Sequence, residues 1–218
     1  MYDLLKKNSE FFFPYFLSLL GGTAFLMLWG KNDISLYING HHNVATDYFF
    51  SYWTNIGLGW LILPVALVLA CINFRYMLMA VVCFLLAFSI NDLLKYVLGT
   101  PRPSIVFEDL HQKFYHVPGL EIFVSNSFPS GHTAISFALF CLLALMVNKP
   151  VFKFLLFVVA FLVGYSRIYL AEHFLTDVIG GSVIGVSCAI LTYKMLTNWK
   201  ALNKFASIDK PLINFRTK

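Results

Sequence analysis

The sequence predicts an all-α fold, a bundle of six transmembrane helices. Hydrophobic residues make up 59% of the 218 residues and charged residues only 12%, and the mean hydropathy is +0.72. A soluble domain has about 45–50% apolar and about 25% charged residues. The excess is concentrated in long apolar runs, a pattern typical of helices that cross a hydrocarbon core about 30 Å thick. We therefore expect residues 1–218 to form a single integral-membrane domain.

The first helix is predicted over residues 11–29, after a short polar start that carries Lys6 and Lys7. Pro14 lies in its first turn, where a missing N–H costs little. Trp29 stands where an aromatic belt is expected at the membrane interface. The run is long enough to span the membrane and lacks a clear small-residue cleavage site, so we expect no cleavable signal peptide.

Residues 30–56 form a polar and aromatic connection that we expect at the membrane interface. The adjacent His41 and His42 invite a metal-binding interpretation, but no Cys, Asp or Glu stands at a convincing ligand spacing. We therefore predict no metal site and interpret the pair as part of an interfacial loop. The four cysteines of the chain all fall inside apolar runs, which favours small buried hydrophobic residues over disulfides or metal ligands.

The second and third helices are predicted over residues 57–74 and 77–98, with a tight turn around Arg75. Asp92 and Lys95 lie near the end of the third helix, where ionisable groups are costly and usually functional. They are three residues apart and could pair on one helix face. We interpret Asp92 as one partner of a structural ion pair.

The longest connection, residues 99–128, precedes the last three helices, which are predicted over 130–147, 151–170 and 177–196. Long connections are frequently functional lids, so we expect this one to contact a bound ligand. Gly181 and Gly185 are small residues four apart, which favours close packing of a neighbouring helix. The basic tail, residues 197–218, is expected to lie on the membrane surface or to be disordered.

The distribution of basic residues predicts the orientation of the bundle. Six spans place both termini on one side of the membrane. That side holds 11 of the 16 basic residues: Lys6, Lys7, Arg75, Lys149, Lys153, Lys194, Lys200, Lys204, Lys210, Arg216 and Lys218. The opposite side holds the remaining five: Lys31, Lys95, Arg102, Lys113 and Arg167. The positive-inside rule then places both termini in the cytoplasm of a multi-pass cell (inner) membrane protein.

Three stretches that carry reactive residues converge on the opposite, periplasmic or extracellular boundary. They are KYVLGTPRP with Lys95 and Arg102, PSGH with Ser130, Gly131 and His132, and SRIYLAEHFLTD with Arg167, His173 and Asp177. Two arginines and a lysine in one place predict an anion site, because their repulsion is tolerable only when an anion or solvent neutralises it. Free N–H groups and a hydroxyl at a helix N-terminus bind phosphate. Gly131 also lets the backbone approach a ligand closely.

The two histidines are predicted to take different catalytic roles. His173 and Asp177 are four apart, so on a helix they share one face. Asp177 can accept a hydrogen bond from one ring nitrogen of His173 and leave the other nitrogen free to attack phosphorus. His132 would give a proton to the departing oxygen and then activate water.

The cations and the amides of Ser130 and Gly131 would hold the equatorial oxygens of the phosphoryl group as charge redistributes. Lys95, Arg102 and Arg167 already supply the positive charge that a magnesium ion would provide. We therefore predict no metal and no cofactor.

The three stretches resemble the signature of the type 2 phosphatidic acid phosphatase superfamily, which also includes vanadium haloperoxidases and bacterial acid phosphatases. The family pattern is Lys, six residues and Arg-Pro; then Pro-Ser-Gly-His; then Ser-Arg, five residues, His, three residues and Asp. The chain matches it without a gap or substitution. The resemblance covers roughly residues 10–197 and implies His173 as the nucleophile, His132 as the general acid and Asp177 as the residue that orients His173. Glu172 is outside the pattern and receives no role.

The resemblance implies an integral-membrane lipid phosphatase. The candidate substrates are undecaprenyl pyrophosphate, phosphatidylglycerol phosphate, phosphatidic acid and lipid A phosphates. The motifs bind phosphate only, so we expect residues 104–127 to choose among these lipids. Nucleic acid is not expected as a partner, because most of the basic residues flank apolar segments.

Two other functions fit parts of the pattern. Phosphotransfer, in which a lipid hydroxyl replaces water, uses the same residues and stays open. A non-catalytic lipid transporter or scramblase on the same fold predicts substitutions among the charged and catalytic positions, and the sequence has none. A vanadate-dependent peroxidase is disfavoured, because those relatives are soluble.

Overall fold

The computed structural model describes residues 1–200, 202 and 208–211, and this part of the chain is α-helical without strands. The helices are α1 (Tyr2–Lys7), α2 (Ser9–Asn39), α3 (Val44–Trp53), α4 (Ile62–Ile72), α5 (Phe74–Leu98), α6 (Pro103–Asp109), α7 (Gly131–Met146), α8 (Pro150–Tyr169) and α9 (Leu175–Asn198). The predicted all-α class is therefore confirmed.

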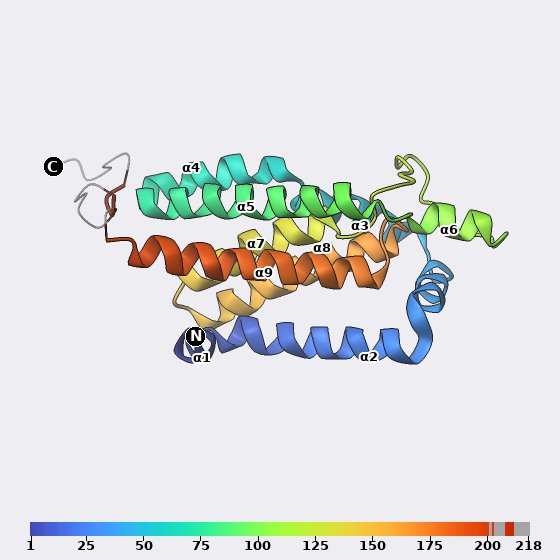
Figure 1. Ribbon diagram of the computed structural model, residues 1–218, viewed down its shortest axis with the longest axis horizontal. Helices are drawn as coiled ribbons and strands as arrows, with labels where there is room; N and C mark the ends of the chain where they lie inside the picture. The colour runs from blue at the N-terminus through green and yellow to red at the C-terminus, as the bar shows by residue number, and fades with distance from the viewer. Residues whose placement is uncertain (201, 203–207, 212–218) are drawn as a thin grey trace.

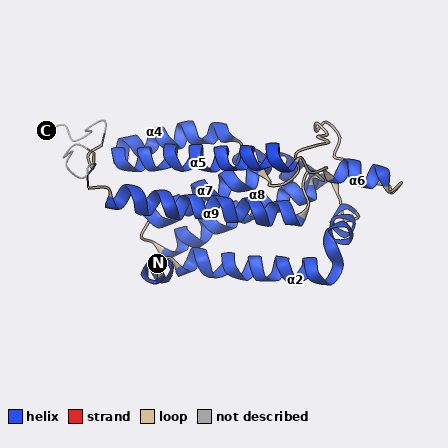
Figure 2. Ribbon diagram, in the orientation of Figure 1, coloured by secondary structure: helices blue, strands red, loops and turns tan. Residues whose placement is uncertain are grey.

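The long helices run along one common axis (Figure 1). α2 lies along one edge of the bundle, α4 and α5 lie along the opposite edge, and α7, α8 and α9 lie between them. α1 and the C-terminal end of α9 are at one end of the bundle, whereas α3 and α6 are at the other. Figure 2 shows that the longest stretch of loop is also at the α6 end.

The first predicted helix, residues 11–29, reaches a kink at its expected end, but the chain does not become a loop there. Gly30 interrupts α2 with φ 76° and ψ 164°, a conformation that glycine adopts without steric cost. Residues 31–39 continue as helix beyond this kink, and α3 follows after a short turn. The predicted polar connection, residues 30–56, is therefore mostly helical.

The second predicted helix, residues 57–74, is a helix only over α4. Two 3-10 turns, Thr54–Gly57 and Gly59–Leu61, precede it, and the chain bends by 55° between α3 and α4. A Cβ atom on Gly57 would lie 2.8 Å from Val163 and 2.9 Å from Cβ of His132. The absence of a side chain at Gly57 lets this 3-10 segment pass against the first turn of α7, a contact that local sequence does not reveal.

Among the described residues, four stretches are long and apolar enough to cross a membrane: Ser9–Asn39, Phe74–Asp109, Pro150–Tyr169 and Leu175–Asn198. The bent pair of α3 and α4 would provide a fifth crossing. α7 has 16 residues, which corresponds to about 24 Å, less than the roughly 30 Å of a hydrocarbon core. The lengths and composition are those of a multi-pass membrane protein.

α7 and α9 form the tightest contact of the bundle. A Cβ atom on Gly181 would lie 2.5 Å from the carbonyl oxygen of Ser130, and one on Gly185 would collide with the carbonyl oxygen of Ala134. The predicted role of these glycines in helix packing is confirmed. Most of α7 is buried, so this helix is the centre of the core.

The expectation for the basic tail concerns residues that lie largely outside the described part of the chain. Residues 208–210 are described and pack against the start of α5. The amides of Phe74 and Arg75 donate to the carbonyl oxygens of Lys210 and Ile208, and Arg75 Nε lies 2.7 Å from Asp209 Oδ1. This contact is at the end of α5 that is remote from Lys95.

Candidate active site

A cavity of about 260 Å³ brings most of the predicted site residues together. Its lining includes Lys95, Arg102, Gly131, His132, Arg167 and His173. These residues come from the end of α5, the start of α6, the first turn of α7, the end of α8 and the loop before α9. Ser130 and Asp177 are not part of the lining and lie behind it. Three separated sequence stretches therefore meet around one cavity.

The loop between α8 and α9 positions His173. Ala171 has φ 64°, which reverses the chain after α8. The amides of Glu172 and His173 then donate to the carbonyl oxygen of Arg167 at 3.0 and 3.1 Å. His173 is only 2% exposed and precedes α9 rather than lying on it.

Asp177 contacts His173 in a different way from the predicted one. His173 and Asp177 do not share a helix face, because α9 begins only at Leu175. Oδ2 of Asp177 accepts hydrogen bonds from the Phe174 amide at 3.0 Å and from Ser127 Oγ at 2.6 Å. It lies 3.5 Å from Nδ1 of His173. The carboxylate thus caps its own helix and also faces the imidazole.

Ser127 is a site residue that sequence reasoning missed. Its hydroxyl lies between the two groups, 2.6 Å from Asp177 Oδ2 and 3.4 Å from His173 Nδ1. Because Nδ1 faces this pair, Nε2 is the nitrogen of His173 that is available to the cavity. Burial lowers the pKa of His173, and the hydrogen-bonding interaction with Asp177 opposes this shift.

The start of α7 presents Gly131 and His132 to the cavity, but not the side chain of Ser130. Ser130 Oγ accepts a hydrogen bond from Thr133 Oγ1 at 2.8 Å, and the Ser130 amide donates to the carbonyl oxygen of Asp177 at 3.0 Å. A Cβ atom on Gly131 would lie 4.0 Å from Nζ of Lys95. The amides of the first helical turn have no intrahelical acceptor and carry the positive end of the helix dipole.

Arg102 and Arg167 are both buried and share one carboxylate. Oε2 of Glu172 lies 2.5 Å from Nη1 of Arg102 and 3.6 Å from Nη2 of Arg167. Arg102 Nε also donates to the carbonyl oxygen of Ser125 at 2.9 Å, and Arg167 Nη1 donates to Thr54 Oγ1 at 2.7 Å. Burial raises the pKa of Glu172, and the two arginines oppose the shift.

The ion pair expected between Asp92 and Lys95 is not formed. Within the described ranges, Asp92 has no cationic partner within 4.0 Å, and both residues line the cavity. The expectation was wrong because the cavity opens beside this turn of α5. Lys95 therefore belongs with the other cations of the site rather than with a structural pair.

Of the two adjacent histidines, His42 belongs to a polar cluster around Asp47, whereas Nδ1 of His41 lies 2.6 Å from the carbonyl oxygen of Tyr37. His42 Nδ1 lies 2.7 Å from Oδ1 of Asp47, and Asp47 also accepts hydrogen bonds from the hydroxyls of Tyr115 and Tyr169. In the part of the chain that is described, no three His, Cys, Asp or Glu residues are grouped as metal ligands. The cluster ties the loop after α6 to α3 and to the end of α8.

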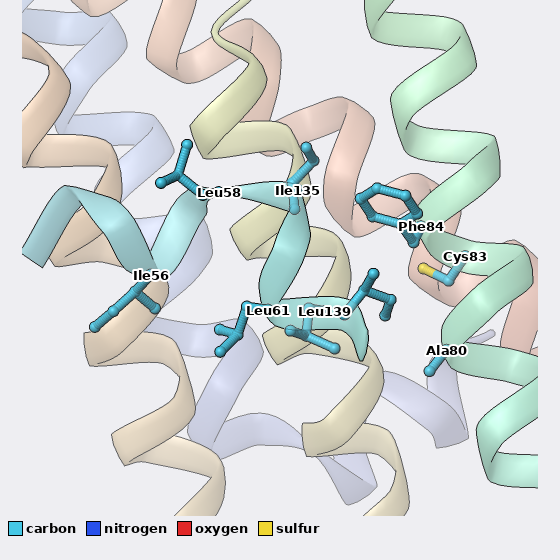
Figure 3. A pocket seen from close by; sticks show the side chains of 9 residues that line it. Ile56, Leu58, Leu61, Ala80, Cys83, Phe84, Ile135 and Leu139 are labelled. Atoms are coloured by element: carbon cyan, nitrogen blue, oxygen red, sulfur yellow. The ribbon is translucent and has the colours of Figure 1, made fainter. Parts of the chain in front are cut away.

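An apolar pocket adjoins the cavity (Figure 3). Its walls are the segment between α3 and α4, one face of α5 around Phe84, and one face of α7 around Leu139. Leu58 and Ile135 line both the pocket and the cavity. An apolar surface therefore continues from the charged cavity into the bundle.

The helical membrane bundle places two histidines and three cations around one cavity. This combination is typical of membrane proteins that bind and process phosphate groups. Residues 75–201 match the PAP2 superfamily, and the chain belongs to this superfamily. The chain is accordingly a phosphoric monoester hydrolase of that superfamily, as its three motifs predicted.

Two relatives illustrate the similarity in sequence. The "Bacitracin transport permease protein BcrC" of Bacillus licheniformis is 30% identical over 63% of this chain and 68% of the relative. The "Lipid A 4'-phosphatase" of Bacteroides thetaiotaomicron is 28% identical over 70% of this chain and 71% of the relative.

Two solved structures share the fold. The crystal structure of Aquifex aeolicus LpxE has a TM-score of 0.65 at 30% identity and covers 74% of this chain and 93% of its own. A "transmembrane PAP2 type phosphatidylglycerolphosphate phosphatase" from Bacillus subtilis has a TM-score of 0.56 at 24% identity and covers 92% of this chain and 98% of its own. The second similarity concerns the fold alone.

Proposed function

We propose that this protein is a metal-independent lipid phosphatase that hydrolyses a phosphate monoester or pyrophosphate of a membrane lipid through a phosphohistidine intermediate. The observation that carries the proposal is the shared cavity of Lys95, Arg102, Arg167, His132 and His173. Its volume of about 260 Å³ is ample for a phosphoryl group and the first atoms of a lipid. The three cations and the first-turn amides of α7 would bind the phosphate oxygens.

In the first step, Nε2 of His173 attacks phosphorus and the bond from phosphorus to the lipid oxygen breaks. His132 gives its proton to that departing oxygen. In the second step, His132 takes a proton from water, the water oxygen attacks phosphorus, and the bond from phosphorus to nitrogen breaks to release inorganic phosphate. Asp177 and Ser127 hold the ring of His173 through its Nδ1 side in both steps.

Apolar residues of the cavity support a lipid as the substrate. Leu58, Phe88 and Ile135 line the cavity together with its charged residues, so a hydrocarbon chain attached to a bound phosphate has an apolar surface beside it. Relatives named as a lipid A 4'-phosphatase and as phosphatidylglycerophosphatase B support the same substrate class. The loop of residues 104–127 is the segment we expect to choose among lipid phosphates.

The proposed topology has six crossings, with the bent pair of α3 and α4 and the short α7 included. Both termini would be cytoplasmic and the cavity would face the periplasm or the cell exterior. The position of α1 and its lysines at the end of the bundle remote from α6 supports this orientation. We further propose that residues 1–218 form one domain around this site.

The test is an assay of purified protein in detergent against a panel of undecaprenyl pyrophosphate, phosphatidylglycerol phosphate, phosphatidic acid and a lipid A phosphate. Release of inorganic phosphate from at least one lipid is expected, and no release from any of them would contradict the proposal. Appearance of the phosphate on a second lipid would instead favour phosphotransfer. Orthovanadate should inhibit as a phosphate mimic.

A further inference from the structure

Glu172 is a buried acidic residue that the reaction described above does not use. It is 8% exposed, and it precedes His173 in the loop after α8. Its Oε2 contacts both guanidinium groups of the site, at 2.5 Å from Arg102 and 3.6 Å from Arg167. Its backbone carbonyl oxygen also lies 3.3 Å from Nη1 of Arg102. One residue therefore touches the side chains contributed by two separate motifs.

The carboxylate of Glu172 contacts the arginines from outside the cavity. Arg102 and Arg167 line the cavity, whereas Glu172 does not. A carboxylate inside the cavity would compete with phosphate for the same donors. Because Glu172 is not among the residues that line the cavity, its carboxylate can stay bound to the arginines while an anion occupies the cavity.

Each arginine is bound by Glu172 and by one further residue. Arg102 is bound by Glu172 and by the carbonyl oxygen of Ser125, and Arg167 by Glu172 and by the hydroxyl of Thr54. Two buried guanidinium groups repel each other, and the carboxylate between them offsets that repulsion. Glu172 is the partner that the two groups share, so it sets their positions relative to each other.

We propose that Glu172 is a positioning residue that holds Arg102 and Arg167 in the geometry required for phosphoryl transfer. This inference rests on the proposed function. Loss of its charge would leave the two arginines free to move apart, and a misplacement of about 1 Å in a site can cost about 10²-fold in rate. The same loss would raise the net positive charge of the site by one, so anion affinity would not fall for electrostatic reasons.

The experiment compares wild type with Glu172→Gln and Glu172→Asp, using the lipid phosphate that the wild type hydrolyses fastest. We expect kcat of Glu172→Gln to fall by about 10²-fold, and the inhibition constant of inorganic phosphate to stay unchanged or become tighter. Glu172→Asp, which keeps the charge, should recover part of kcat. Asp209→Asn is the matched control, because it removes the carboxylate partner of Arg75 at the remote end of α5.

Four results separate the possibilities. Wild type without any phosphatase activity contradicts the proposed function itself. An active wild type with unchanged kcat in Glu172→Gln overturns the role of Glu172. A fall in kcat that is matched by weaker phosphate inhibition also overturns it, because the substitution would then have disturbed ground-state anion binding. The same fall in Asp209→Asn overturns it too, because a general loss of active protein would then explain the effect.

When Glu172→Gln does not fold, Glu172→Asp carries the test, because its shorter side chain withdraws the carboxylate from the arginines, and a kcat equal to that of wild type would overturn the role. When Glu172→Gln folds, a double-mutant cycle adds a second test. Arg102→Gln removes the closer partner of Glu172, and Arg102→Gln with Glu172→Gln leaves two neutral groups in contact. Because Glu172 also contacts Arg167, Glu172→Gln should slow the Arg102→Gln variant, but by less than it slows wild type. Losses in kcat/KM that multiply would show that Glu172 acts independently and would overturn the proposal.

Discussion

Oδ2 of Asp177 lies 3.5 Å from Nδ1 of His173, and the hydroxyl of Ser127 donates to the same carboxylate oxygen at 2.6 Å. The carboxylate also accepts a hydrogen bond from the Phe174 amide and so caps α9. The orientation of the imidazole is thus linked to the start of the helix that follows it. The proposed chemistry depends on this arrangement.

Replacement of His173 by alanine should abolish phosphate release, because no other group is placed to form the covalent intermediate. The variant should still fold, which thermal unfolding in detergent would check. Incubation of wild type with lipid labelled in its phosphate, followed by alkaline denaturation, should leave label on the protein, and the variant should leave none. Sustained turnover by His173→Ala would remove this residue from its proposed role.

Replacement of Ser127 by alanine should slow turnover without abolishing it. The variant loses a hydrogen bond to a buried charged group, worth about 1.5–3 kcal/mol, which corresponds to roughly 10- to 100-fold in rate when it is felt in the transition state. Steady-state kinetics would measure the change in kcat. Ser104→Ala serves as a control for loss of a serine hydroxyl, because Ser104 lies in α6 and its hydroxyl donates to the carbonyl oxygen of Phe123 rather than to Asp177.

The acid limb of the pH profile of kcat/KM should lie well below pH 6.5. Burial lowers the pKa of His173, so its proton leaves more readily than that of an exposed histidine, whose pKa is about 6.5. The nucleophile therefore stays neutral and active as the pH falls through 6.5, and loses activity only near its lowered pKa. A loss of kcat/KM on the acid side centred at pH 6.5 would contradict a buried neutral nucleophile.

Gly185→Ala should destabilise the protein, because its Cβ atom would collide with the carbonyl oxygen of Ala134 in the contact between α7 and α9. Overpacking of this kind costs about 1–3 kcal/mol. Gly21→Ala is the matched control, since nothing lies within 4 Å of its Cβ position in α2. That variant should keep or slightly raise the midpoint of thermal unfolding. Equal midpoints for the two variants would contradict the close approach of the helices.

Phosphate release should persist in excess EDTA. Lys95, Arg102 and Arg167 line the cavity and supply the positive charge that phosphoryl transfer requires. The assay is run with EDTA at a concentration well above that of contaminating metals, and then with added magnesium. A strict requirement for magnesium would show that the cations alone are insufficient.

The sequence predicts the parts of this site that depend on short spacings. The helix class and the end of the first span follow from apolar runs and a glycine, and both appear in the structure. The cavity residues follow from three motifs whose internal spacing is fixed. The 3-10 segment before α4 does not follow, because the close contact of Gly57 with His132 joins residues that are far apart in the sequence.

The contacts of Ser127 and Glu172 also could not be predicted from local sequence patterns. Each acts across a long separation in sequence, Ser127 on Asp177 and Glu172 on Arg102. A signal for Glu172 was present, since an acidic residue directly before the predicted nucleophile could neutralise the buried arginines. The ion pair expected for Asp92 was wrong for a similar non-local reason. Asp92 lines a cavity to which other helices contribute, and local spacing does not reveal that cavity.

The left-handed backbone of Ala171 affects which part of the protein unfolds first on warming. A non-glycine residue in that conformation costs of order 1 kcal/mol, and glycine would make the same turn without it. The turn is therefore stabilised by the hydrogen bonds that the amides of Glu172 and His173 donate to the Arg167 carbonyl oxygen, rather than by the conformational preference of Ala171. Fraying of the last turn of α8 would release the nucleophile first, so inactivation should precede global melting when the protein is warmed.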